Sequence, residues 1–306
     1  MPANRDTDIA CKTALVTGST GYVGSHLVQR LVKDGWNVHA IVRPKSIAPA
    51  VASIDSVVIH RHDGSTENLI AIVAAARPHT VFHLASLFLA QHQPKDIEPL
   101  IRSNVLSGAQ LLEAMKESGV NHLVNTGTSW QHFENKHYSP VCLYAATKQA
   151  FETIIQYYVE TSSFKVITLK LFDTYGPNDR RAKLFTLLRS VASEKKSIAM
   201  SPGEQLIDLV YIDDVVDAFV LAASRLETQK ESTAEEYSVS SGTPLSLREL
   251  VATYARVTGK TLDVTWGGRP YRPREVMVPW TKGALLPGWQ PRTRLEDGIR
   301  LMETAC

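Results

Sequence analysis

The first half of the chain alternates short apolar runs with segments whose apolar residues recur at helical spacing. The apolar runs occupy 12–18, 37–43, 56–63, 80–86, 122–129 and 165–173, and the helical patterns occupy 22–35, 66–78, 104–119 and 143–160. Regular alternation of strand and helix is typical of a parallel sheet with covering helices. The pattern therefore predicts an α/β protein.

The alternation ends near residue 175, and the second half predicts a smaller lobe built from several pieces. Helical patterns recur at 184–196, 213–227, 246–260 and 294–305, with one strand at 236–242. We expect Asp213 or Asp214 to cap the helix at 213–227, and a serine to open the helix at 246–260. The stretch 266–291 is rich in glycine, proline and arginine, so it should be irregular.

Composition excludes several classes of protein. The chain is 44% hydrophobic and 21% charged with a net charge of +2, and no basic run interleaved with aromatics suggests nucleic acid. No apolar stretch approaches 18 residues, and "MPANRDTDIACK" has no signal-peptide core, so we expect no membrane segment and a cytoplasmic location. The three cysteines lack metal or disulfide spacing, and His60 and His62 lack a third ligand, so no metal site is expected.

Residues 17–24 read "TGSTGYVG" and lie between the first apolar run and the first helical pattern. Glycine lets the backbone turn tightly and approach a pyrophosphate, while a helix N-terminus offers free N–H groups and the positive end of its dipole. Gly18, Gly21 and Gly24 are three apart, which differs from the usual G-x-G-x-x-G. In this context the loop predicts a dinucleotide site. Its other expected contacts are Thr20, Tyr22 and Val23.

The residue that ends the second apolar run bears on the choice between NAD and NADP. An acidic residue about 20 positions beyond the loop would bind the ribose 2′-hydroxyl of NAD, whereas arginine accommodates the 2′-phosphate of NADP. Arg43 stands 19 positions after Gly24, which predicts NADP; a solvated arginine before Pro44 is the alternative. Asp63 can accept from the adenine amine or cap the next helix. Further expected cofactor contacts are Gly64, Leu84 and Ala85.

Tyr144 and Lys148 stand four apart in "LYAATKQAF", and Tyr144 lies 16 residues after Thr128 in "HLVNTGTS". Positions i and i+4 share one face of a helix, so the phenol and the ammonium should point the same way. A nearby cation favours the phenolate and lowers the pKa of tyrosine, which lowers the barrier to proton transfer. Beside a hydride carrier, this pair and a strand-end hydroxyl can interconvert a carbonyl and an alcohol. A solvated surface pair is the alternative.

Over nearly its whole length the chain resembles the extended short-chain dehydrogenase/reductase family. The resemblance is carried in order by "TGSTGYVG", "TVFHLAS", "NVLSGAQLLEA", "TGTS", "YAATK", "LFDTYGP", "LVYIDDVVDA" and "GWQPRTRLEDGI". It implies a Rossmann-type doubly wound parallel sheet in an NADP-binding domain at 12–175 plus about 208–241. A smaller, discontinuous C-terminal substrate lobe would span 176–207 plus 242–306.

The same resemblance assigns roles to particular residues. It implies Thr128, Tyr144 and Lys148 as the catalytic trio, with Tyr144 and Lys148 also beside the cofactor and Lys148 touching the nicotinamide ribose. It further implies a homodimer joined by the helices at 104–119 and 143–160. The usual substrate in this family is a nucleotide sugar.

Within the family, "VNTGTS", the short spacing to "LYAATKQ" and "LKLFDTYGPND" are most similar to CDP-abequose and CDP-paratose synthases. This resemblance implies NADPH-dependent reduction of the C4 ketone of a CDP-linked 3,6-dideoxy-hexulose. A 4,6-dehydratase would need an acid and a base beside Thr128. Ser129, Trp130 and Gln131 stand there instead, and Glu134 has no acidic neighbour, which argues against dehydration.

Seven residues are candidates for binding the substrate. They are Ser129, Trp130, Phe172, Asp173, Arg180, Arg269 and Arg272. Arginine suits a diphosphate because its fork presents several donors, although each of the three is otherwise a solvated loop residue. Trp130, Phe172 and Tyr175 either line a site for the apolar methyl of a 6-deoxy sugar or pack in the core. Ser129 either assists Thr128 or merely ends the strand.

Two departures from the family pattern affect nucleotide binding. The family often has asparagine where Asp173 stands, and a carboxylate cannot donate to a phosphate. It also often has arginine before "LVYIDD", where Ile207 and Asp208 stand. We therefore expect the region of Arg269 to contribute more to nucleotide binding. His83 is expected to steady the sheet edge near the cofactor rather than to act as an acid.

Together these features predict an NADP-dependent oxidoreductase that reduces the C4 ketone of a nucleotide-linked 4-keto-6-deoxy hexose. A nucleotide-sugar epimerase is the first alternative, although Arg43 argues against the tightly held NAD of such enzymes. A carbonyl reductase of a small ketone comes next. An NADP-binding, non-catalytic regulator is the alternative of a different class, and the intact Thr128, Tyr144 and Lys148 set argues against it.

Overall fold

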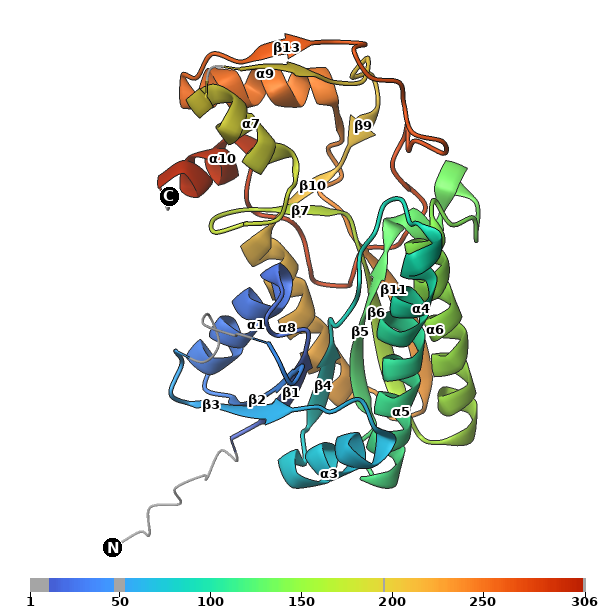
Figure 1. The fold of residues 1–306 in the computed structure, drawn as a ribbon. Coiled ribbons are helices and arrows are strands. Elements are labelled where there is room, and N and C mark those ends of the chain that lie inside the picture. The colour runs from blue at the N-terminus through green and yellow to red at the C-terminus, as the bar shows by residue number, and fades with distance from the viewer. Residues whose placement is uncertain (1–10, 47–52, 195, 305–306) are drawn as a thin grey trace, which may run out of the picture.

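A seven-stranded parallel sheet forms the centre of the protein in a computed structural model that describes residues 11–46, 53–194 and 196–304 (Figure 1). Its strands are β1 (Thr13–Thr17), β2 (Asn37–Val42), β3 (Val57–Arg61), β4 (Thr80–His83), β5 (His122–Thr128), β6 (Lys165–Leu171) and β11 (Thr233–Val239). They are ordered β11-β6-β5-β4-β1-β2-β3, and every neighbouring pair is parallel. This order confirms the predicted Rossmann-type doubly wound sheet.

Helices cover both faces of the sheet. One face carries α1 (Tyr22–Lys33) and α8 (Ile212–Thr228), and the other carries α3 (Thr66–Ala76), α5 (Ser107–Glu117) and α6 (Leu143–Thr161). Side chains alternate between the faces along each strand. Ala14 and Val16 join the core under α1 and α8, whereas Leu15 between them joins the core under α3, α5 and α6. Burial on both faces explains why the strands read as nearly continuous apolar runs.

The helix expected at 104–119 begins earlier and changes type along its length. A short turn, η1 (Pro94–Asp96), leads into α4 (Ile97–Ile101), then into a π-helical turn, η2 (Arg102–Leu106), and then into α5. A π-helical turn widens the helix locally and is frequent at functional sites. This turn places Asn104, which is 1% exposed, inside the protein.

A second group of elements lies above the carboxyl edge of the sheet (Figure 1). It contains α7 (Leu184–Glu194), α9 (Leu247–Thr258), α10 (Leu295–Thr304), β8 (Ser197–Ala199), β9 (Leu206–Ile207), β12 (Leu245–Ser246) and β13 (Asp263–Thr265). Between this group and the sheet, β7 (Asp173–Tyr175) pairs in parallel with β10 (Leu209–Tyr211). A smaller lobe made of separate chain segments is therefore present, while the predicted domain boundaries themselves stay a prediction.

Two predictions about the second half are confirmed by the structure, and a third is wrong. Residues 266–291 contain no helix, and their one β-contact is an isolated bridge between Leu285 and Ser238. Ser246 caps α9 and forms a capping box with Glu249. The expected cap of α8 by Asp213 or Asp214 is wrong, because the helix begins at Ile212 and both carboxylates lie in its first turn. None of the helices in the described ranges combines the length and apolar character needed to cross a bilayer.

Phe82 tests the contribution of the central strands to stability. It is fully buried in β4 and meets Trp36 edge to face, with the ring centroids 6.2 Å apart. We expect Phe82→Ala to lower the free energy of unfolding by about 3–5 kcal/mol, because the substitution removes buried apolar surface and leaves a cavity. Urea unfolding followed by circular dichroism measures this loss. Leu301→Ala is the control. Leu301 is 49% exposed, so this substitution should change the free energy of unfolding by no more than about 0.5 kcal/mol. Equal losses in the two variants would contradict the placement of Phe82 in the core.

Candidate functional site

The predicted glycine loop lies against the backbone that follows β4. Gly18 has a φ of 70°, and its carbonyl accepts a hydrogen bond of 2.9 Å from the N–H of Gly21, which is the N-cap residue of α1. A Cβ atom on Gly18 would come within 2.6 Å of the backbone of Leu84 and Ala85. Only glycine fits there. The structure thus brings the loop, Leu84 and Ala85 together at the start of α1, where free N–H groups favour an anion.

A hydrogen bond ties the carboxyl ends of β1 and β4 together. Thr17 Oγ1 lies 2.8 Å from His83 Nδ1 and also accepts from the N–H of Ala85 at 3.2 Å. His83 is 2% exposed, and burial, assisted by the nearby charge of Lys148, lowers the pKa of His83 to about 3. The imidazole is therefore neutral near pH 7 and steadies the sheet edge, in agreement with the role expected of it.

The trio of the predicted site comes from two neighbouring elements. Thr128 ends β5, while Tyr144 and Lys148 lie one turn apart near the start of α6, and all three side chains are buried. Thr128 Oγ1 accepts a hydrogen bond of 3.3 Å from the N–H of Trp130. That contact uses an acceptor position of the hydroxyl, so its proton stays available for donation.

The pKa of Tyr144 differs from the sequence-based expectation. Burial raises the pKa of Tyr144 well above its ordinary value, the charge of Cys142 adds to this effect, and a hydrogen bond with Ser86 opposes it. The expected lowering by Lys148 is therefore wrong for the protein alone, because burial outweighs any favourable charge. Burial also lowers the pKa of Lys148 to about 8; Glu152 opposes this lowering, and Lys170 adds to it.

Asn104 organises the site, and the sequence analysis missed it as a site residue. Its Oδ1 accepts from the N–H of Leu87 at 2.7 Å, and its Nδ2 donates to the Leu87 carbonyl at 3.0 Å and to Thr147 Oγ1 at 2.9 Å. The Ser86 hydroxyl also donates to Asn104 at 3.2 Å. Through Asn104 the loop after β4 is joined to Thr147, near the start of α6. In the sequence Asn104 stands first in the helical pattern 104–119, where asparagine is an ordinary helix cap, so no signal marks it as a site residue.

Phe88 is a second residue that the sequence did not reveal. Its ring is 45% exposed and lies edge-on to Tyr144, with 5.0 Å between the ring centroids. The Phe88 and Trp130 centroids are 5.5 Å apart, and the Arg272 guanidinium lies over Trp130. These aromatic rings form an apolar wall beside the phenol. Phe88 lies in the loop after β4, which has no helical or strand period, so no pattern marks it.

Five of the seven predicted substrate residues line one cavity of about 120 Å³, and two do not. Those that line it are Ser129, Trp130, Phe172, Asp173 and Arg272. Arg180 and Arg269 are both exposed and do not line this cavity. Tyr175 is 3% exposed and packs against Phe185 and Tyr211, so it belongs to the core.

Two basic side chains beside this cavity are paired with carboxylates: Arg272, which lines it, and Lys183, which contacts the lining residue Asp173. Glu275 accepts two hydrogen bonds from the Arg272 guanidinium, at 2.9 and 2.7 Å. Lys183 donates to Asp173 at 2.8 Å and lies 5.3 Å from the centre of the Phe88 ring. Asp208, which the sequence identified as a departure from the family pattern, accepts from Ser240 and Ser241 at 2.6 and 2.8 Å.

The two residues expected to select the adenosine end lie after β2 and β3. Arg43 is exposed, and its carbonyl accepts from the N–H of Ser46 at 3.0 Å in a turn. Asp63 is also exposed and accepts from both the N–H and the hydroxyl of Ser65. Ser65 rather than Asp63 is the N-cap residue of α3, so the helix-cap alternative for Asp63 is wrong. Gly64 adopts a φ of 102° between them.

The histidines considered for metal binding have other partners. His60 stacks on His39 with 2.8 Å between Nε2 and Nδ1, while His62 meets the Asn68 side chain at 3.1 Å. Across the described part of the chain, no three metal-ligating side chains form a group.

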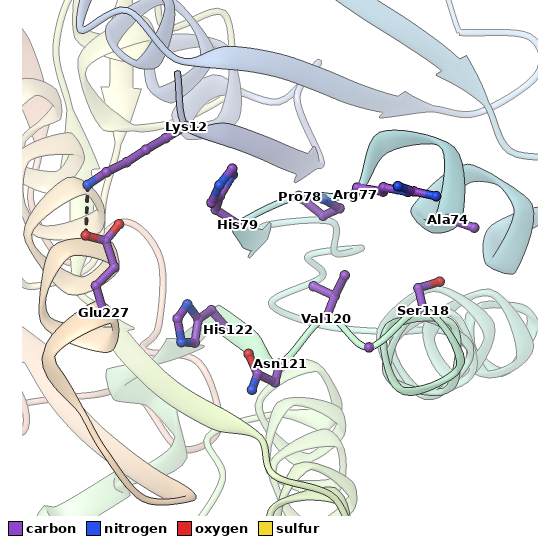
Figure 2. A pocket seen from close by; sticks show the side chains of 11 residues that line it. Lys12, Ala74, Arg77, Pro78, His79, Ser118, Val120, Asn121, His122 and Glu227 are labelled. Atoms are coloured by element: carbon purple, nitrogen blue, oxygen red, sulfur yellow. Dashed lines mark hydrogen bonds and ion pairs between the residues drawn. The ribbon is translucent and has the colours of Figure 1, made fainter. Parts of the chain in front are cut away.

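A larger hollow of about 750 Å³ lies at the opposite edge of the sheet, among the amino ends of the strands (Figure 2). Lys12, His79 and His122 line it, and Lys12 forms an ion pair with Glu227 across one side at 2.8 Å. Ligands of open parallel sheets bind at the carboxyl ends of the strands. Since no predicted site residue lines this hollow, its size does not make it the candidate site.

Comparison with known proteins agrees with this geometry. Residues 14–239 match the NAD dependent epimerase/dehydratase family. A curated relative, CDP-abequose synthase of Salmonella muenchen, is 27% identical over 95% of this chain and 97% of its own length.

Two solved structures are similar throughout. MoeE5 in complex with UDP-glucose and NAD has a TM-score of 0.82 and 26% identity, and the match covers 96% of this chain and 98% of that one. UDP-glucose 4-epimerase of Thermus thermophilus, in complex with NAD, has a TM-score of 0.80 and 25% identity over the same shares. The candidate site thus lies in a chain whose relatives include both a synthase and an epimerase of nucleotide sugars by name.

His83 gives a pH-dependent test of the site. Because its pKa is lowered in the folded protein, the unfolded chain binds more protons between about pH 6.5 and 3, and this histidine's contribution to stability is lost as the pH falls through that window. From pH 7 to 4.5, we expect the native chain to lose on the order of 2 kcal/mol more stability than His83→Gln, whose amide can still meet Thr17. Urea unfolding at both pH values measures the difference. Equal losses of stability in the native chain and in His83→Gln would contradict the lowered pKa of His83 and place its ring in a polar environment.

Proposed function

This chain belongs to the NAD dependent epimerase/dehydratase family, and on that premise we propose that it reduces the C4 ketone of a nucleotide-linked 4-keto-6-deoxy hexose with NADPH. The observation that carries the proposal is the placement of Tyr144 and Lys148, buried on α6, with Thr128 at the end of β5 and the glycine loop at the same sheet edge. A proton donor, a cation and a carbonyl-orienting hydroxyl are the groups that ketone reduction requires.

The residues around the glycine loop fit a dinucleotide. Gly18 and Gly24 leave no room for a Cβ atom, so the loop packs tightly against its own backbone and that of Leu84 and Ala85. It leads directly into the start of α1, where free N–H groups suit a pyrophosphate. In the proposal Arg43 binds the 2′-phosphate, and Asp63 and Gly64 lie by the adenosine. When bound, NADPH would supply the hydride. Solved relatives that hold NAD support a nicotinamide dinucleotide, and Arg43 favours the phosphorylated form.

The protein's own residues would handle the proton. Thr128 donates a hydrogen bond to the ketone oxygen and orients it. Tyr144 is neutral near pH 7, since burial raises a pKa that ordinarily lies near 10, so it has a proton to give to the oxygen as hydride reaches carbon. Lys148 stabilises the phenolate that remains after transfer, and its ammonium also suits the cofactor ribose hydroxyls. The product is an alcohol that carries the Tyr144 proton.

The cavity beside the trio suits a deoxygenated sugar. Phe172 and Trp130 line it, and Phe88 extends the apolar wall to Tyr144. A methyl or methylene group loses little beside such a wall, whereas a hydroxyl would lose hydrogen bonds to water. We therefore propose a 6-deoxy substrate, with a CDP-linked 3,6-dideoxy sugar as the more specific form. The similarity to a CDP-abequose synthase supports that form.

A nucleotide-sugar 4-epimerase is the second candidate, because a UDP-glucose 4-epimerase matches this chain nearly as well as the synthase does. Loss of NADPH absorbance on adding a 4-keto nucleotide sugar supports the reductase. Turnover of a 4-hydroxy nucleotide sugar without net change in the cofactor supports the epimerase.

We propose a homodimer that associates through α5 and α6. Leu106, at the end of η2 just before α5, is 43% exposed and Tyr157 on α6 is 60% exposed, and each offers apolar surface to a second copy. A cytoplasmic location fits the composition and stays part of the proposal.

Tyr144→Phe tests the proton donor. The substitution removes only the hydroxyl, so we expect kcat for reduction of a 4-keto nucleotide sugar to fall about 10²- to 10⁴-fold while NADPH still binds. Stopped-flow absorbance and cofactor fluorescence measure the two quantities. Tyr157→Phe on the same helix is the control and should retain full activity, because its ring is 60% exposed whereas the trio is buried. Full activity in Tyr144→Phe would remove tyrosine from the mechanism.

Arg43→Ala tests the choice of cofactor. We expect the dissociation constant for NADPH to rise about 10- to 100-fold and that for NADH to change little, because only NADPH carries the 2′-phosphate. Titration of cofactor fluorescence measures both constants. The exposed Arg300 on α10 supplies the control as Arg300→Ala, which should leave both unchanged. An equal loss for both cofactors would contradict the proposed phosphate contact.

A further inference from the structure

A buried ion pair joins α6 to β6, one helical turn beyond Lys148 of the candidate trio. Glu152 on α6 accepts from the amine of Lys170 on β6 at 2.6 Å, and the Lys170 side chain is 0% exposed. Glu236 on β11 lies 3.4 Å from the same amine and is about half exposed. Gly127 on β5 leaves the space for this pair, since a Cβ atom there would come within 2.7 Å of Lys170 and 3.0 Å of Glu152. Buried charges are costly, so a pair in this place needs an explanation.

Glu152 is connected to Thr128 by two hydrogen bonds through one glutamine. Gln131 Nε2 donates to Glu152 at 3.1 Å, and Gln131 Oε1 accepts from the backbone N–H of Thr128 at 3.0 Å. The same Nε2 lies 2.8 Å from Gln149 on α6. Gln131 is 0% exposed, so water does not replace these contacts. The position of Glu152 therefore fixes the backbone that carries the Thr128 hydroxyl.

Glu152 also stands one helical turn after Lys148, on the same face of α6. Lys148 is 2% exposed, and its amine makes no hydrogen bond or close ion pair with a residue in the described ranges. Its charge therefore depends on groups farther away. Burial lowers the pKa of Lys148 to about 8, the Glu152 charge opposes that lowering, and the Lys170 charge adds to it.

We propose that Glu152 is a positioning residue of the candidate site, which keeps the Lys148 amine charged and holds Thr128 in place through Gln131. Lys170 has two opposed effects: it anchors the carboxylate and it weakens the field that the carboxylate exerts on Lys148. This assignment rests on the proposed function, because it gives Glu152 its role through the Thr128, Tyr144 and Lys148 trio.

Few other titratable groups face these residues. From α6, Tyr144 and Glu152 face Lys148; from β4, His83 faces it; and from β6, Lys170 does. His83 and Tyr144 are both neutral near pH 7. Around the ion pair, the described part of the chain adds Glu236 on β11 and the neutral His132 after η3 (Ser129–Gln131). Near neutral pH the charges that control Lys148 are therefore those of Glu152 and Lys170.

The test measures the protonation of Lys148 directly. The ¹³Cε signal of Lys148 in the free protein, assigned by its absence in Lys148→Arg, is followed against pH. We expect Glu152→Gln to move the titration midpoint down and Lys170→Met to move it up, each on the order of one pH unit. Glu160→Gln is the matched control, because Glu160 is an exposed carboxylate on the same helix and pairs with Gln156. It should leave the midpoint unchanged.

The pH profile of kcat/KM is the second readout. If Lys148 must be charged, the basic limb should move down in Glu152→Gln and up in Lys170→Met, while Glu152→Asp restores the limb toward its native position. A purely structural role would lower activity in both variants without moving the limb in opposite directions. If Glu152→Gln fails to fold, Lys170→Met, which replaces a buried amine by an apolar chain of similar length, still gives the opposite shift.

The two readouts separate this inference from the proposed function. An unchanged Lys148 midpoint in both variants overturns the inference, whether or not the enzyme reduces a ketone. Shifted midpoints in a protein that turns over no 4-keto nucleotide sugar support the electrostatic link and overturn the proposed reaction. Shifted midpoints with matching limbs support both.

Discussion

The placement of β1 between β2 and β4 is the constraint on which the candidate site depends. From β1 the chain passes through α1 to β2 on one side, while β4 lies on the other side and is followed by helices on the opposite face. The two connections diverge, so a crevice opens at the carboxyl ends of the strands. Gly18 and the Leu84–Ala85 backbone meet across it at a distance that excludes a Cβ atom. The need for glycine in the loop follows from strand order as much as from any ligand.

Burial of polar groups gives this crevice its chemistry and makes it costly to build. His83 and Asn104 satisfy their hydrogen bonds with Thr17, Leu87 and Thr147, so their burial is compensated. Lys148 has no such close partner among the described residues, and burial lowers its pKa to about 8. A lysine this close to its titration point responds to modest changes in the surrounding charge. The structure thus places Lys148, the group of the site most sensitive to charge, one helical turn from Glu152, whose own partner Lys170 is fully buried.

Residues with a local signal could be predicted, and residues fixed by tertiary contacts could not. The strands can be predicted because both faces of the sheet are buried, which makes each strand a nearly continuous apolar run. The trio is predicted from the spacing of Thr128, Tyr144 and Lys148, and its catalytic role stays a prediction. Asn104 depends on a π-helical turn, and the pairing of Arg272 with Glu275 depends on a segment without any period. The direction of the Tyr144 pKa was wrong for a related reason: its sequence spacing shows a cation one turn away but not the depth of burial, which is the larger effect.

The Glu275 carboxylate on Arg272 would affect how a nucleotide binds at this arginine. Glu275 occupies the Nε and Nη2 edge of the Arg272 guanidinium, so a diphosphate that binds this edge would displace Glu275, while Nη1 keeps donors for a second acceptor. Both residues lie in the irregular segment 266–291, which is attached to the sheet side through Arg274 on Ser139 and Thr281 on the side chain of Asn135. Asn135 ends η4 (Phe133–Asn135), four residues beyond Gln131. Exchange of Glu275 for a phosphate would therefore act on a segment that is tied, a few residues away, to the turn that holds Thr128. Nucleotide binding and orientation of the ketone would then be coupled through one short stretch of chain rather than through movement of whole lobes.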